Sequence, residues 1–206
     1  IGVSMLLSSW LFISYLSGHN VNESHLIYTW YATRGYFFEI GLLIDSLTIV
    51  MAFIVTFISF FVHMYSIAYM EGDPSFKRFF IYTNFFTFSM LFIIFSNNFL
   101  QLFIGWELVG LSSYLLIGFW YNKPSAVSAN LKAFVVNRVG DIGLLLGVIL
   151  ILITSNSLNY ADFFEKLPLL KDSTVNFLGY HIELLPFMAL LLFIGAAAKS
   201  AQIPLH

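Results

Sequence analysis

Long apolar runs, each close to the length that crosses a lipid bilayer, dominate this sequence of 206 residues. A membrane-spanning helix needs roughly 20 consecutive, mostly apolar residues. About six runs approach that length, at 1–17, 43–70, 78–96, 98–121, 131–154 and 184–199. Because no strand-like alternation of apolar and polar residues persists, the sequence predicts an all-α fold, a polytopic bundle of about six transmembrane helices.

The overall composition points to the same class of protein. Hydrophobic residues make up 59% of the chain and charged residues 10%, with a mean hydropathy of +0.86, whereas an ordinary soluble domain is about a quarter charged. The formal net charge of −2 lacks the basic excess of a nucleic-acid-binding protein. The absence of cysteine excludes disulfides, thiolate metal sites and cysteine nucleophiles. We therefore expect an integral protein of the lipid bilayer with no nucleic-acid partner.

The breaks between the runs define the domain organisation. Gly72 and Pro74 end the second run, because proline cannot continue a helix and glycine weakens it. Two longer polar segments, 18–42 and 155–183, are expected to be extramembrane loops of a single membrane domain covering 1–206.

Lysine and arginine near the ends of the runs predict the orientation in the membrane. The loops after the second and fourth runs are short and basic, with Lys77, Arg78 and Lys123. Short basic loops stay on the inner side of a membrane, which places 71–78 and 122–131 facing the cytoplasm, or the matrix of a mitochondrion. The two longer loops then face outward, toward the intermembrane space in the mitochondrial case.

Four ionisable residues fall well inside the apolar runs: Glu107, Arg138, Asp141 and Lys199. Such residues are rare in membrane helices and usually face a bundle interior or a water-filled cavity. Glu107 is therefore a candidate proton site, with a structural ion pair as the alternative. Arg138 and Asp141 are three positions apart, so they share one helix face and can pair. Such a pair could hold the helix in place without transporting a proton.

The last apolar run carries a lysine beside a predicted helix break. Gly195 and the alanines that follow allow another helix to approach closely, and Pro204 predicts unwinding over 200–204. Unwound backbone at membrane depth is tolerated where it lines a cavity, a recurring device in ion transporters. Lys199 is thus a candidate proton site that could pair with Glu107, while the alternative is a lysine that snorkels to the interface. His206, after the break, is a candidate proton relay or a bystander.

Motifs for bound cofactors are absent from the sequence. It contains no glycine-rich nucleotide loop, no P-loop and no pair of histidines at helical spacing for haem. We expect no flavin, haem or iron–sulfur site in this chain, so any redox chemistry belongs to partner proteins.

Several longer motifs resemble the chain 5 family of mitochondrial NADH–ubiquinone oxidoreductase, an antiporter-like membrane subunit of respiratory complex I. They occur in order over residues 40–206 and are specific as a set: "DSLTIVM" (45–51), "HMYSIAYM" (63–70), "NFLQLFIGWELVGLSSYLLIGFW" (98–120), "NRVGDIGLLLG" (137–147) and "AKSAQIPLH" (198–206). Members of this family are longer and are built from inverted repeats. The resemblance therefore implies an N-terminal portion, either a fragment or the product of a split gene, that forms most of the first half-channel.

The resemblance also implies roles for individual residues. Glu107 matches the proton-site glutamate, Lys199 the lysine on the broken helix, and Asp141 the acid that modulates this pair, with Arg138 beside it. The implied activity is that of a subunit of a proton-translocating NADH:ubiquinone reductase, in which quinone reduction elsewhere drives the pumping of protons.

The implied setting is the mitochondrial inner membrane. The implied partners are other complex I subunits, including neighbouring antiporter-like subunits and possibly a separate chain that carries the C-terminal part. NAD(H), FMN, iron–sulfur clusters and ubiquinone are expected in those partner subunits, and no metal or cofactor in this chain. Two other functions stay open at this point: a subunit of a cation/proton antiporter of the same superfamily, and a membrane anchor whose buried charges serve only helix packing.

Overall fold

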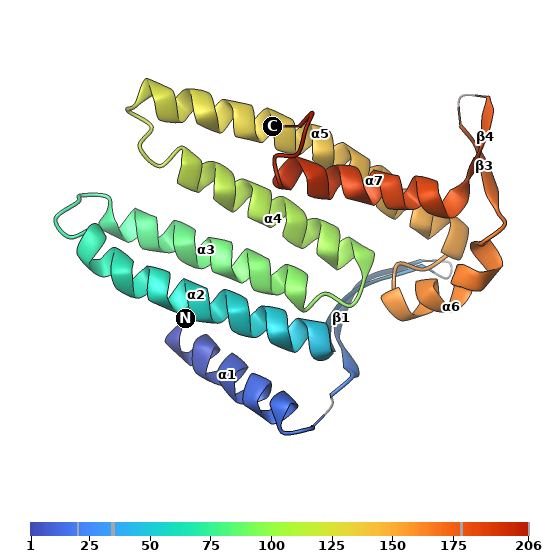
Figure 1. Ribbon diagram of the computed structural model, residues 1–206, viewed down its shortest axis with the longest axis horizontal. Helices are drawn as coiled ribbons and strands as arrows, with labels where there is room; N and C mark the ends of the chain where they lie inside the picture. Colours follow the sequence, from blue (N-terminus) through green and yellow to red (C-terminus); the bar gives the residue numbers. More distant parts are fainter. Residues whose placement is uncertain (20, 34–35, 178, 206) are drawn as a thin grey trace.

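The computed structural model describes residues 1–19, 21–33, 36–177 and 179–205 (Figure 1). Within these residues the chain forms seven helices and four strands. In chain order they are α1 (Gly2–Leu16), β1 (Glu23–Thr33), β2 (Tyr36–Ile44), α2 (Ser46–Tyr69), α3 (Phe76–Ile94), α4 (Phe99–Ile117), α5 (Pro124–Ser155), α6 (Tyr160–Leu170), β3 (Thr174–Phe177), β4 (Tyr180–Glu183) and α7 (Leu184–Lys199). The helices confirm the positions of the apolar runs to within a few residues, except that α5 begins seven residues earlier, at Pro124 rather than 131.

The long helices lie side by side in a row, and each runs antiparallel to the next (Figure 1). Packing follows the order α1, α2, α3, α4, α5, α7. The closest approach is between α5 and α7, where a methyl group added at Gly140 would lie 2.2 Å from the Cβ of Ala198. Small residues at a helix interface let two backbones approach closely, as is common in membrane proteins. The row therefore brings α4, α5 and α7 together, and these are the helices that carry the predicted charges.

Three of the described helices are long and apolar enough to cross a membrane: α2, α4 and α5. The helices α1 and α7 are apolar but shorter. Many large apolar side chains along the row are exposed, such as Leu47 on α2 and Ile153 on α5, which suits helices that face lipid. The expected count of about six spans, and the inverted repeat, stay predictions.

The all-α prediction is wrong for parts of the two longer polar segments, where the chain forms two antiparallel hairpins. Strand β1 pairs with β2, and β3 pairs with β4. Both hairpins are rich in aromatic and β-branched residues, which favour extended structure. Each hairpin pairs the inner edges of its two strands through backbone hydrogen bonds, so these segments fold locally without becoming helices. Gly179, with a φ of +87°, allows the tight turn between β3 and β4.

Polar side chains at the start of α4 attach the first hairpin to the bundle. The amide N–H of Gly41 in β2 donates to Oε1 of Gln101 at 3.0 Å, and Nδ2 of Asn98 donates to the carbonyl of Glu39 at 2.9 Å. Asn98 also caps α4, because its side chain accepts from the amide N–H of Gln101. The side chain of Asn97 lies against Gly41, which has no Cβ to prevent this approach.

An apolar core fills the end of the bundle that carries both hairpins and α6 (Figure 1). Its buried members come from α4, α5, α6 and α7 and from the turn before α6: Phe99, Val148, Ile151, Leu158, Phe163, Leu184 and Met188. This core fixes α6 across the ends of α4 and α5. At the other end of the row, α7 stops at Lys199, and the described residues after it form turns, with Ala201 at a φ of +50°. The expected unwinding over 200–204 is therefore confirmed.

Candidate functional site

The predicted charges of three neighbouring helices gather at one place in the bundle. Glu107 lies on α4, Arg138 and Asp141 lie one helical turn apart on α5, and Lys199 ends α7. Each of the four is close enough to act electrostatically on the buried Asp141 or Lys199. The fifth candidate, His206, lies outside the described residues.

Glu107 and Arg138 form an ion pair across the α4–α5 interface. The guanidinium of Arg138 also lies over the ring of Phe134, at 5.3 Å from its centroid. This pairing differs from the expected contact between Arg138 and Asp141, because the long arginine side chain extends to the neighbouring helix. Asp141, at 5% exposure, lies deeper in the bundle.

Of the two carboxylates near Lys199, Asp141 acts more strongly on its amine than Glu107 does. Its Nζ is buried and has no hydrogen-bond partner, and the same is true of Oδ1 of Asp141. The ion pairs within the described ranges do not include Lys199, so the expected direct contact with Glu107 is absent from this arrangement. The four charges therefore form two sets, a paired Glu107–Arg138 and a separated Asp141 and Lys199.

Cavities adjoin both sets of charges. A cavity of about 30 Å³ between α4 and α5 is lined by Glu107 and Asp141, among others. A larger one of about 310 Å³ is lined by Lys199 and, toward the start of α5, by Lys132. Ala133 and Asn137 line both.

These volumes decide what the cavities can hold. A buried water needs roughly 10–15 Å³ and two or more polar partners. The smaller cavity meets this requirement for a single water, and the larger one has room for several. The unpartnered atoms of Asp141 and Lys199 are buried polar groups beside these cavities, and a shift of either side chain would bring them within reach of such waters. The arrangement can thus move protons between an acid, a base and water.

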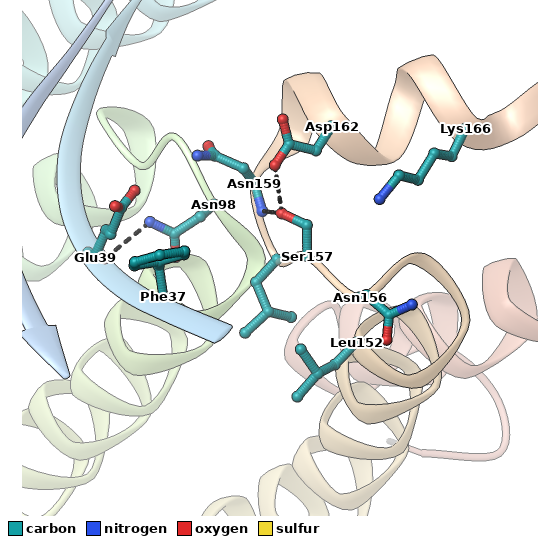
Figure 2. A pocket seen from close by; sticks show the side chains of 10 residues that line it. Phe37, Glu39, Asn98, Leu152, Asn156, Ser157, Asn159, Asp162 and Lys166 are labelled. Atoms are coloured by element: carbon teal, nitrogen blue, oxygen red, sulfur yellow. Dashed lines mark hydrogen bonds between the residues drawn. The ribbon is translucent and has the colours of Figure 1, made fainter. Parts of the chain in front are cut away.

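A separate polar cavity of about 300 Å³ lies at the hairpin end of the bundle (Figure 2). Its ionisable side chains are Glu39 of β2 and Asp162 and Lys166 of α6. Ser157 Oγ donates to Asp162 Oδ2 at 2.6 Å, and Lys166 Nζ donates to the carbonyl of Ser155 at 2.6 Å. None of the predicted charges lines this cavity. Sequence reasoning missed it because most of its residues belong to segments that were expected to be plain loops, and only Asn98 and Leu152 among them come from expected helices.

Two α4 residues next to the charges were also missed by the sequence analysis. The buried indole N–H of Trp106 lies near the Asp141 carboxylate, and its ring centroid lies 5.8 Å from Nζ of Lys199. Gly110 faces the same amine. The signal that could have found them is their spacing, because Trp106, Glu107 and Gly110 fall within one helical turn. No group of three histidine, aspartate or glutamate side chains that could hold a metal occurs in the part of the chain that the structure describes.

Two family models match the chain. Residues 96–206 match the family described as NADH:quinone oxidoreductase/Mrp antiporter, TM, and residues 30–80 match NADH-ubiquinone oxidoreductase (complex I), chain 5 N-terminus. All of the described charges of the site lie within the first match.

The chain is also similar to curated proteins. It is 48% identical over its full length to NADH-quinone oxidoreductase subunit L of Neisseria meningitidis, of which it covers 31%. It is 46% identical, over 91% of its length, to NADH-ubiquinone oxidoreductase chain 5 of Chondrus crispus, covering 28% of that protein. A chloroplastic NAD(P)H-quinone oxidoreductase subunit 5 of Nuphar advena is 42% identical over the full chain, of which 27% is covered. The chain spans about a third of the length of these relatives.

Solved structures share the fold. One chain of the Mrp complex from Dietzia sp. DQ12-45-1b aligns with a TM-score of 0.77 and 21% identity, covering 99% of this chain and 21% of the other. A chain of the membrane-bound sulfane sulfur reductase, an archaeal respiratory membrane complex, aligns with a TM-score of 0.76 and 20% identity, covering 99% of this chain and 38% of the other. The helical row with its two hairpins is thus a known membrane fold.

Proposed function

Because the chain belongs to the NADH:quinone oxidoreductase/Mrp antiporter transmembrane family, we propose that it is part of a proton-translocating subunit of NADH:ubiquinone oxidoreductase. The relatives named subunit L and chain 5 support this assignment over the whole of the chain. In this proposal the chain contributes most of the first half-channel, and quinone reduction elsewhere in the complex drives transport. NAD(H), FMN, iron–sulfur clusters and ubiquinone belong to the partner subunits.

One observation carries the proposal: acids and bases from three adjacent helices meet beside cavities that can hold water. Glu107 and Asp141 are the carboxylates, and Lys199 is the amine that can give up or accept a proton. A buried amine close to a carboxylate is stabilised in its charged form, and it loses that support when the two separate. A small movement of α7 relative to α4 and α5 would therefore load or release a proton at Lys199.

The Glu107–Arg138 pair is a structural ion pair that holds Glu107 in one of two positions. Arg138 stays charged in proteins and cannot itself pass a proton on. While it holds Glu107, the carboxylate is paired with the guanidinium and kept away from Lys199. Transfer of Glu107 from Arg138 toward Lys199 would exchange partners within the cluster. Such an exchange between two arrangements is what an alternating proton site requires.

The test compares proton pumping with assembly in membranes that contain the whole complex. We expect Glu107→Gln and Lys199→Ala to lower the number of protons moved per quinone reduced, with the complex still assembled. Lys77→Ala, which removes an exposed positive charge at the start of α3, is the matched control and should pump normally. Normal pumping in assembled Glu107→Gln and Lys199→Ala complexes would instead favour a packing role for these charges.

The proposed topology places about six spans in the mitochondrial inner membrane, with 18–42 and 155–183 on the outer side. These spans would form part of an antiporter-like inverted-repeat fold. The apolar helices and the chain 5 relatives support a membrane location. Because some relatives are bacterial or chloroplastic, another energy-converting membrane is the alternative location. A protease or epitope tag in 155–183, probed from each side of sealed vesicles, tests the orientation.

A cation/proton antiporter subunit is the second candidate function. The family description names the Mrp antiporter, and the fold aligns with a chain of an Mrp complex. Purification of the native complex separates the two candidates. NADH dehydrogenase activity that co-purifies with this chain supports the first, and its complete absence, with cation-dependent proton exchange, supports the second.

A further inference from the structure

Gly110 occupies a special place opposite Lys199. It lies on α4, one turn after Glu107, on the side that faces α7. A Cβ added at Gly110 would lie 2.6 Å from Nζ of Lys199. Apart from its chain neighbours and the nearby backbone of α4, no other atom would lie within 4 Å of this Cβ. The missing side chain therefore makes a notch in α4 that takes the lysine amine and borders the small cavity lined by Glu107 and Asp141.

The amine in this notch is held by shape and charge rather than by hydrogen bonds. Its Nζ is buried and unpartnered, and the nearest aromatic face is Trp106. The charged groups that act on it come from both neighbouring helices: Asp141 and Arg138 on α5, and Glu107 on α4. A side chain at position 110 would therefore displace the amine toward or away from these charged groups.

Other glycines of the bundle serve a different purpose. A Cβ at Gly105, on the same helix, would lie 2.6 Å from Ile93 Cγ1 and 3.2 Å from the backbone nitrogen of Ile93, on α3. Gly105 thus permits two helices to pack, whereas Gly110 meets only the mobile end of one side chain. Alanine at Gly110 should be tolerated by the helix, because alanine favours helix more than glycine does.

We propose that Gly110 is a positioning residue for proton transfer, which sets where the Lys199 amine sits between Asp141 and Glu107. The inference rests on the proposed role of Lys199 in transport and adds a residue that borders both the Lys199 amine and the small cavity lined by Glu107 and Asp141. Misplacement of a reacting group by about 1 Å can cost on the order of a hundredfold in rate. We expect at least a tenfold loss here.

The test measures proton pumping by the whole complex in native membrane vesicles, for Gly110→Ala, Lys199→Ala and the double variant. Gly110→Ala should pump at least tenfold more slowly at unchanged assembly, and the midpoint of the pH dependence of pumping should move. In the Lys199→Ala background, Gly110→Ala should have no further effect, since the amine it displaces is gone. Gly105→Ala is the matched control: it should reduce assembly and leave the pH midpoint of the remaining complex unchanged.

Three results would overturn the inference. One is wild-type pumping by Gly110→Ala while Lys199→Ala pumps poorly, which refutes the notch and leaves the proposed function intact. A second is an additive effect of the two substitutions. The third applies if Gly110→Ala fails to assemble: removal of the amine in the double variant should then restore assembly, and failure to do so would show that Gly110 packs against something else. Normal pumping by Lys199→Ala itself would mark the failure of the proposed function instead.

Discussion

Substitution of Gly140 by alanine tests how the α5–α7 interface holds the site together. The added Cβ would lie 2.2 Å from Ala198 Cβ and 3.3 Å from the backbone carbonyl oxygen of Ile194. Two carbon atoms in contact rest about 3.5–4.0 Å apart, so the helices must separate by roughly 1.5 Å. The backbone of α7 cannot rotate out of the way as a flexible side-chain end can.

The energetic cost follows from this clash. Overpacking of a close interface costs about 1–3 kcal/mol, and the better helix propensity of alanine returns up to about 1 kcal/mol. We therefore expect a net destabilisation on the order of 1–2 kcal/mol. Gly140 precedes Asp141 and Ala198 precedes Lys199, so the same separation should also move the acid from the base and slow proton pumping.

The assay is the thermal loss of assembled complex in membranes, followed by native gel, together with pumping by the complex that remains. Gly147→Ala on the same helix is the control, because its added Cβ would meet first the Cδ2 of Leu192, at 2.9 Å, which is the end of a flexible side chain. The reasoning is refuted if Gly140→Ala matches the wild type in thermal stability and pumping, or if Gly147→Ala is the more damaging of the two.

Three further predictions concern the surroundings of the site. Arg138→Ala should lower the amount of assembled complex more than the pumping of what assembles, because the Glu107 carboxylate loses its paired cation. Gln101→Ala should leave the amide N–H of Gly41 without an acceptor, cost about 1–3 kcal/mol and expose the first hairpin to protease. Burial raises the pKa of Tyr160 to about 12, and its hydrogen bond with Ser96 opposes this rise more weakly. Because the folded state favours the neutral phenol, the protease resistance of 155–183 should be intact below about pH 10 and fall toward pH 12.

Each of these predictions has a control. For Arg138, the Arg138→Lys variant keeps the cation; an assembled Arg138→Ala complex that does not pump would show that the arginine acts in transport. For Gln101, the Gln101→Glu variant keeps an acceptor oxygen and should protect the hairpin better than alanine does. For Tyr160, the Tyr160→Phe variant has no proton to lose, so its protease resistance should not fall between pH 10 and 12; an identical fall in both proteins would assign it to other groups.

The helices could be predicted from the sequence because bilayer thickness imposes a length that apolar runs reveal directly. The ends were less certain. The second run was expected from 43, but β2 continues to Ile44 and Asp45 caps α2, accepting from the amide N–H of Thr48 at 2.8 Å. The helix α5 extends back to Pro124, because a helix can continue past its apolar part into water. Hydropathy does not report that extension.

The hairpins could not be predicted from periodicity. The strands show no sustained alternation of apolar and polar residues, and the first hairpin is held to α4 by a contact that is distant in the sequence, between Gly41 and Gln101. Glu107, Arg138, Asp141 and Lys199 lie on neighbouring helices, as expected, while His206 lies outside the described residues and the roles of all five stay predictions. Their pairing was not predictable, since helical spacing shows which residues share a face, whereas the reach of Arg138 to Glu107 depends on how closely α4 and α5 pack.

The central claim is that water reaches the acids and bases in the middle of the bundle. These 206 residues contain no cysteine, so one introduced thiol labels one position in them, and the unsubstituted complex treated with the same reagent accounts for the thiols of partner subunits. Ala133 lines both cavities of the site, while Leu146, further along α5, is an exposed apolar residue that should face lipid. In sealed vesicles that contain the whole complex, we predict that Ala133→Cys reacts with a small, charged, membrane-impermeant thiol reagent added on the side of residues 118–123, and that pumping then stops. Leu146→Cys should stay unmodified. An Ala133→Cys thiol that stays inert from both sides, while Asn122→Cys in the loop reacts, would contradict a wet path to Lys199.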